Sequence, residues 1–109
     1  MKTKRDFTVS RGNVFADLGV SAPEEALAKA ELAAKVAEVI SSKRFTQSAA
    51  AKLLGIDQPK VSALLRGRLT GFSTDRLLKY LRILGRDVDI VIRTRQRTTG
   101  IGHLHVRTA

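Results

Sequence analysis

The sequence contains no cysteine, so disulfides and thiolate zinc sites are excluded. It also lacks an apolar run approaching the roughly 18 residues that a membrane-spanning helix requires. The N-terminus, "MKTKRDFTVSRGNVF", is charged and has no apolar segment of the kind found in signal peptides. These absences predict a cytoplasmic protein with no membrane partner.

Aromatic residues are scarce, and this limits the kind of core the chain can build. The 109 residues include five aromatic side chains: Phe7, Phe15, Phe45, Phe72 and Tyr80. A core made mostly of Leu, Val, Ile and Ala favours helices. A chain of this length is one domain in size and can bury a modest core of its own. The expected fold class is therefore mainly α.

Acidic residues are few in the second part of the chain. Residues 1–42 carry six basic and six acidic side chains, whereas residues 43–109 carry fourteen basic and four acidic ones. The whole formal net charge of +10 therefore lies in residues 43–109. A basic field of this kind attracts polyanions and speeds their association. We expect a nucleic acid as the partner, in preference to a merely solvated basic surface.

Helical periodicity divides the middle of the chain, residues 23–85, into several segments. The expected helices cover residues 23–42, 47–54, about 57–65 and 74–84. Thr46 and Ser73 stand at N-cap positions, and Gly55 and Gly85 follow helix ends. Residues 1–22 show no sustained period and are expected to form an N-terminal arm with one short helical turn. The chain thus has four to five helices.

The period changes in residues 86–109. In "DVDIVIRTR", Val88, Ile90 and Ile92 occupy alternate positions, which is typical of a strand. "HLHVRT" alternates again with Leu104 and Val106, so the two segments are expected to form a C-terminal β-strand or hairpin. An isolated hairpin is marginally stable, so its apolar face needs a partner. We expect a homodimer, formed either through this segment or through the helix expected at 74–84.

Residues 46–66 have the pattern of two short helices joined by a tight turn. Gly55 permits the positive φ of such a turn without a Cβ penalty. Ala51 must be small because the following helix crosses over it. Ile56, Val61 and Leu64 would bury the inner face of that helix. Its outer face would then present short polar groups, as a helix that enters a DNA major groove does.

At Gln47, Ala51, Gly55, Val61 and Leu64 the sequence resembles the helix-turn-helix proteins of the Cro/repressor (XRE) type. The stretch "DQPKVSALLRGR" is similar to the third helix of that family, and the resemblance extends over about residues 30–84. It implies a lambda-repressor-like helical DNA-binding domain. It also implies a sequence-specific transcriptional repressor that binds double-stranded DNA.

Roles follow for individual residues of this unit. The expected base contacts are Gln58, whose amide can bond adenine in a bidentate way, Pro59, which can touch a thymine methyl group, and Ser62, which can reach a base or a phosphate. The expected backbone contacts are Thr46, Gln47, Ser48, Lys60, Arg66 and Arg68. Lys52 and Arg44 are as well explained as solvated surface residues.

The stretch "GNVFADLGVSAPEEALAKAEL" is similar to the N-terminal part of small XRE proteins, many of them HigA-like antitoxins. That resemblance implies a RelE/HigB-like ribonuclease toxin as a partner and repression of the shared operon. A stand-alone regulator without a toxin remains an alternative, as does a toxin-neutralising module whose helix-turn-helix is vestigial. An RNA-binding protein is disfavoured, because exposed aromatic side chains for base stacking are not evident.

The sequence offers little for catalysis or metal binding. Two histidines, no cysteine and scattered acidic residues form no evident nucleophile–base pair. His103 and His105 could lie on one strand face, but no third ligand is evident, so surface histidines are expected. We therefore expect no enzyme, no catalytic residue, no metal and no cofactor.

Overall fold

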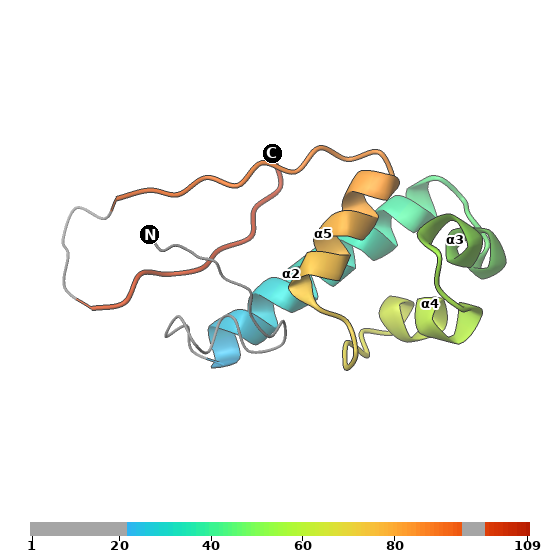
Figure 1. Ribbon diagram of the computed structural model, residues 1–109, viewed down its shortest axis with the longest axis horizontal. Coiled ribbons are helices and arrows are strands. Elements are labelled where there is room, and N and C mark those ends of the chain that lie inside the picture. The colour runs from blue at the N-terminus through green and yellow to red at the C-terminus, as the bar shows by residue number, and fades with distance from the viewer. Residues whose placement is uncertain (1–21, 95–99) are drawn as a thin grey trace.

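The computed structural model describes residues 22–94 and 100–109 of the chain. Its helices are α2 (Ala22–Ser42), α3 (Gln47–Leu54), α4 (Gln58–Leu65) and α5 (Thr74–Ile83), as Figure 1 shows. Each expected helix is present with its ends within one residue, and the mainly α class is confirmed. The arm expected over residues 1–22 lies outside the described residues, except that Ala22 begins α2.

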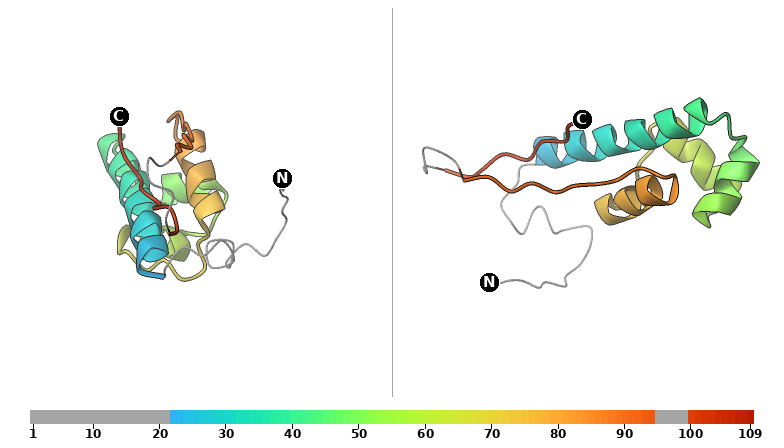
Figure 2. Two further views of the ribbon diagram at one scale, coloured as in Figure 1. Left: turned by 90° about the vertical axis from the view of Figure 1, so that its left-hand side faces the viewer. Right: turned by 90° about the horizontal axis from the view of Figure 1, so that it is seen from above.

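The long helix α2 forms the base on which the other helices pack. Glu24 and Glu25 lie in its first turn, where carboxylates interact favourably with the helix dipole. One side of α2 is buried along much of its length, through Ala28, Leu32, Val36 and other apolar residues. Figures 1 and 2 show α5 lying against this helix. On the outer side, Lys35 Nζ lies 2.8 Å from Glu38 Oε1, and this hydrogen bond lowers the pKa of Glu38.

All four helices contribute to one hydrophobic core. Val36 of α2, Val61 of α4 and Leu77 of α5 are each fully buried. Burying one such side chain contributes roughly 1.5–3 kcal/mol. Phe72, in the loop before α5, packs edge to face on Tyr80, with the ring centroids 6.3 Å apart. The core therefore fixes the position of α4 relative to α2 and α5.

The expected C-terminal β-strand or hairpin is wrong for the single chain. The structure assigns neither helix nor strand to residues 86–94 and 101–109, and Figure 1 shows both segments as long, open stretches of chain. Figure 2 shows the first segment leaving α5 and the second returning toward α2. The side chains of Ile90 and Ile92 are 75% and 91% exposed, so the expected apolar face is not covered. Alternation sets which side chains share a face, but a strand also needs a neighbour for its backbone hydrogen bonds.

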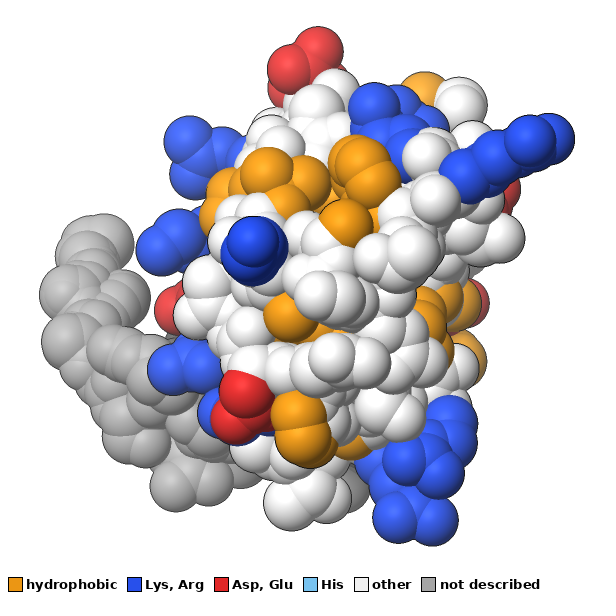
Figure 3. All heavy atoms as spheres, turned by 90° about the vertical axis from the view of Figure 1, so that its right-hand side faces the viewer, with side chains coloured by type: hydrophobic (Ala, Val, Ile, Leu, Met, Phe, Trp, Pro, Cys, Tyr) orange, Lys and Arg blue, Asp and Glu red, His pale blue; other side chains and the backbone are white. Residues whose placement is uncertain are grey.

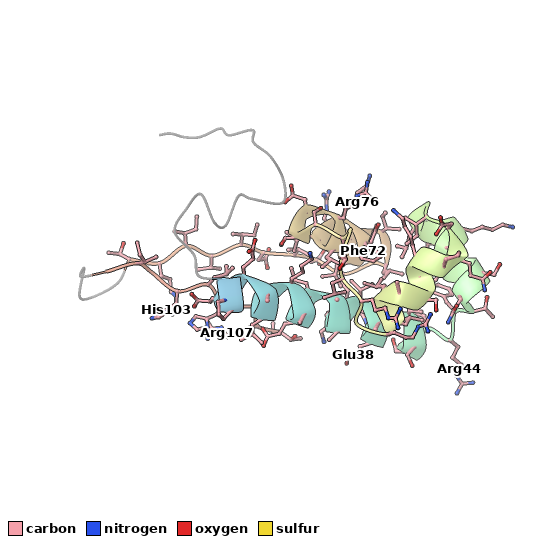
Figure 4. The ribbon with its side chains drawn as sticks, turned by 90° about the horizontal axis from the view of Figure 1, so that it is seen from below. Glu38, Arg44, Phe72, Arg76, His103 and Arg107 are labelled. Atoms are coloured by element: carbon pink, nitrogen blue, oxygen red, sulfur yellow. The ribbon has the colours of Figure 1, made fainter. Side chains whose placement is uncertain are left out.

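Part of the C-terminal segment is nevertheless attached to the helices. Val88 and Val106 are half-buried and pack against the core. Glu24 Oε2 accepts a hydrogen bond from the backbone N–H of Leu104 at 3.1 Å and lies 3.2 Å from His103 Nδ1. The returning segment is thus fixed to the N-terminal end of α2, where Figure 4 shows His103 and Arg107.

Among the helices of the described residues, none is both long and apolar enough to cross a membrane.

Candidate nucleic-acid interface

The turn between α3 and α4 depends on Gly55. This residue adopts φ 74°, in the left-handed region that favours glycine. The carbonyl oxygen of Ala51 accepts hydrogen bonds from the backbone N–H of Gly55 at 2.9 Å and of Ile56 at 3.1 Å. Both bonds satisfy the end of α3 in the usual manner of a left-handed cap. As a result α4 begins only four residues after Leu54, and the two helices pack against each other.

The inner side of α4 is held in the core. Val61 and Leu64 are 0% and 2% exposed, and Ile56 in the turn is half-buried. Ala51 on α3 is 7% exposed, so there is little room for a larger side chain at that position. The residues expected to be structural in this unit are therefore all placed in or beside the core, apart from the exposed Gly55.

The first turn of α4 faces solvent. Asp57 is its N-cap, with Oδ1 accepting a hydrogen bond from the backbone N–H of Lys60 at 3.0 Å. Gln58, Pro59 and Lys60 follow and are all exposed. Pro59 fits there because the first turn of a helix does not need its missing N–H. Two of the expected base contacts, Gln58 and Pro59, thus stand together at the exposed N-terminal end of α4.

Ser62, the third expected base contact, has a partner within its own helix. It is half-buried, and its Oγ accepts a hydrogen bond from Arg66 Nη2 at 2.9 Å. The serine hydroxyl keeps its own proton for donation to another acceptor. The pair links an expected base contact to an expected backbone contact. The spacing of four residues in a helix is a sequence signal from which this pair could have been predicted.

The N-terminus of α3 presents a second set of polar groups. Thr46 is the N-cap, and its Oγ1 accepts a hydrogen bond from the backbone N–H of Ala49 at 3.0 Å. Gln47 and Ser48 are exposed in the first turn. The first N–H groups of a helix lack intrahelical partners, and together with the helix dipole they favour an anion such as a phosphate.

Basic side chains surround these two helices. Residues 43–86 contain ten Lys and Arg residues and two acidic ones. Figure 3 shows the end of the molecule that carries α3 and α4, with Lys and Arg side chains projecting at several places around it. Arg68, an expected backbone contact, is exposed in the loop after α4. The positive charge around α3 and α4 favours the binding of a polyanion.

Arg44 was left undecided by the sequence and now joins the candidate residues. It lies two positions before Thr46, is exposed, and has φ 59°, which is uncommon for a residue with a Cβ. Figure 4 shows its side chain projecting away from the helices. The position of Arg44 next to the N-terminus of α3 adds positive charge beside the expected phosphate contacts.

His103 lies away from this surface, beside Glu24 at the N-terminal end of α2 (Figure 4). The ring centroids of His103 and His105 are 5.9 Å apart. Within residues 22–94 and 100–109, no group of three or more His, Asp or Glu side chains is arranged to hold a metal ion. The candidate interface is therefore built from α3, α4 and the loops that flank them.

Comparison with known proteins agrees with this geometry. A family model described as a helix-turn-helix domain matches residues 14–93. A solved structure described as an XRE family transcriptional regulator is 44% identical in sequence, with a TM-score of 0.76. The match covers 82% of this chain and 100% of that chain. Among curated proteins, none matches the chain.

Proposed function

Because the chain belongs to the XRE family of helix-turn-helix transcriptional regulators, we propose that it represses transcription by placing α4 in the major groove of duplex DNA. One observation carries this proposal. Val61 and Leu64 fix α4 from its inner side, while Gln58, Pro59 and Lys60 are exposed at its N-terminal end. An α-helix with its side chains is about 10–12 Å in diameter, which matches the roughly 12 Å width of the major groove. Regulators of this family are typically not enzymes.

In this proposal Gln58 and Pro59 read bases. The amide of Gln58 offers a donor and an acceptor, which match N7 and N6 of adenine. Pro59 presents an apolar surface to a thymine methyl group. Ser62 lies one turn further along and donates its remaining proton to a base edge or a phosphate. Discrimination between sequences therefore rests mainly on the first turn of α4.

The other polar and basic groups bind the sugar–phosphate backbone. The α3 N-terminus, with Gln47 and Ser48 beside the Thr46 cap, accepts a phosphate. Lys60, Arg66 and Arg68 place positive charge on and after α4. Such contacts fix the position of the protein on the duplex and contribute affinity on every sequence.

We further propose that the repressor acts as a homodimer. A single α4 reaches few base pairs, and proteins of this architecture bind two half-sites about 34 Å apart. Two linked helix-turn-helix domains bind a two-fold symmetric site much more tightly than one domain does.

The antitoxin role is a narrower proposal, supported by the resemblance of residues 12–32 to HigA-like proteins. In that role the chain would bind a RelE/HigB-like toxin and repress the operon they share. Co-expression with the product of the adjacent gene tests it. A stable complex that also binds the operon's promoter supports an antitoxin, whereas a neighbour that neither binds the chain nor arrests growth leaves a stand-alone regulator.

Selection from random libraries tests the DNA-binding proposal. The purified full chain is offered random duplex DNA and, separately, random single-stranded RNA. We expect enrichment of one duplex sequence with two-fold symmetry, bound about 10³-fold or more tightly than scrambled duplex at physiological salt. Equal binding to all duplexes, or tighter binding to RNA than to any duplex, contradicts the proposal.

A further inference from the structure

Three consecutive β-branched side chains stand in solvent on the C-terminal segment. Ile90, Val91 and Ile92 are 75%, 75% and 91% exposed. The segment after α5 is drawn out in Figure 1, and within the described part of the chain it forms no strand. An extended segment of this composition presents both apolar side chains and backbone hydrogen-bonding groups to a partner.

The sequence around these residues is symmetric about Val91. Ile90 and Ile92 flank it on one face of the extended segment. Asp89 and Arg93 stand two positions away on either side, with opposite charges. Both charged side chains are exposed, and they share a face with Val91 because side chains alternate along extended backbone.

This symmetry makes the segment complementary to a second copy of itself. When two copies run antiparallel with their Val91 residues opposite, Asp89 of each copy faces Arg93 of the other. Ile90 of each copy faces Ile92 of the other, so four isoleucines meet on one side of the pair. Opposite charges and β-branched residues directly across an antiparallel pair are stabilising.

Other registers lose this match. A parallel in-register pair sets Asp89 against Asp89 and Arg93 against Arg93, and like charges directly opposite are destabilising. An antiparallel pair centred on Ile90 sets Asp89 against Val91 and leaves the carboxylate without its cation. An antiparallel pair centred on Ile92 would set Asp89 against Arg95, but it also sets Ile90 against Thr94 and Val91 against Arg93. The charges and the apolar side chains together therefore favour the antiparallel pair centred on Val91.

We propose that the chain dimerises through antiparallel pairing of residues 88–94 of two copies about a two-fold axis at Val91. This arrangement supplies a hydrogen-bonding neighbour, which residues 88–94 do not have among the described residues of one chain, and it makes the same surface serve both subunits. Figure 1 shows the segment running away from α5 on the side opposite to α3 and α4, so the pairing leaves α4 uncovered. The interface specifies the proposed homodimer without depending on any DNA contact.

Single-cysteine variants test the register, because the wild-type chain contains no cysteine. The Cα atoms of two opposed residues in an antiparallel pair are about 4.5–5.5 Å apart, which a disulfide can bridge. The two Thr94 residues would be six positions out of register, or about 20 Å apart. Under mild oxidation V91C should run largely as a covalent dimer on a non-reducing gel, while T94C stays largely monomeric. Equal cross-linking of both variants, or no cross-linking of V91C, overturns the register.

Charge reversal tests the pairing in solution by sedimentation without DNA. D89R and R93D each set like charges opposite one another twice, so each should dimerise on the order of tenfold more weakly than wild type. An equimolar mixture of the two restores both opposite-charge pairs and should recover dimers. D75R, changed on α5 outside the segment, should match wild type. A wild-type chain that stays monomeric at high concentration, or a mixture that dimerises no better than either variant alone, overturns the proposal. Since DNA is absent, a failure here leaves the DNA-binding proposal untouched.

Discussion

Arg66 donates a hydrogen bond from Nη2 to the hydroxyl oxygen of Ser62, 2.9 Å away and one turn earlier on α4. The contact holds the Arg66 guanidinium against the preceding turn of α4. Without it, this long side chain would sample many rotamers. Since Arg66 is an expected phosphate contact and Ser62 an expected base or phosphate contact, the pair couples the two roles. Their separate contributions can be measured.

Arg66→Ala should lower affinity on every duplex sequence. Removing one phosphate contact should also flatten the slope of log K against log salt by about one unit. Titrations at several salt concentrations measure this. Lys29→Ala, near the N-terminal end of α2, is the control and should leave the slope unchanged. An unchanged slope in Arg66→Ala would remove this residue from the backbone contacts.

Ser62→Ala distinguishes positioning from direct contact. If Ser62 acts mainly by holding Arg66, its removal should weaken DNA binding less than Arg66→Ala does. It should then have little further effect in the Arg66→Ala background. Affinities of the two single variants and the double variant give the coupling energy. Equal losses from Ser62→Ala in both backgrounds would mean that the serine contacts DNA by itself.

Ala51→Leu should disturb the packing of α4 on α3. Ala51 is 7% exposed, and overpacking such a site costs roughly 1–3 kcal/mol in the free energy of unfolding. DNA affinity should be lost while far-UV helicity stays largely intact. Ala49→Leu, on an exposed position of the same helix, is the matched control for urea unfolding. Normal operator affinity in Ala51→Leu would contradict the packing of the turn described above.

Asp57 combines a stabilising cap with a negative charge at the end of α4 that we propose faces DNA. Its carboxylate accepts the backbone N–H of Lys60, and asparagine can do the same. Asp57→Asn should keep the stability of the fold and raise affinity for all duplexes at low salt, because a negative charge beside the phosphates is removed. Asp57→Ala loses the cap, so its free energy of unfolding should be lower than that of wild type by about 1 kcal/mol. Weaker DNA binding by a stable Asp57→Asn would show that the carboxylate itself takes part in recognition.

The helices could be predicted from the sequence because their signals are local. Thr46 and Ser73 accept hydrogen bonds from backbone N–H groups three residues later, as N-caps do, and Gly55 takes the left-handed conformation that ends α3. The resemblance to XRE-type proteins is confirmed by the helix-turn-helix family model over residues 14–93 together with the XRE regulator structure that is 44% identical. These features depend on a few neighbouring residues each.

The features that could not be predicted depend on contacts between residues that are distant in sequence, or on contacts outside one chain. The contact of Phe72 with Tyr80 and the attachment of Leu104 to Glu24 follow from tertiary packing. The alternation of Val88, Ile90 and Ile92 predicted a strand, which the structure does not assign, because periodicity does not say what lies across from a strand. The expectation of a hairpin failed at that step. The roles of individual residues in DNA binding remain predictions.

The central claim is that α4 reads sequence through its first turn, and Gln58→Ala tests it most directly. Affinity of wild type and variant is measured on the duplex selected by the wild-type chain and on a scrambled duplex of equal length, at the same salt. Gln47→Ala, a glutamine assigned to the backbone, is the matched control and should weaken both duplexes alike. We predict that Gln58→Ala loses about 1–3 kcal/mol on the selected duplex and almost nothing on the scrambled one. An equal loss on both duplexes would contradict base reading by α4.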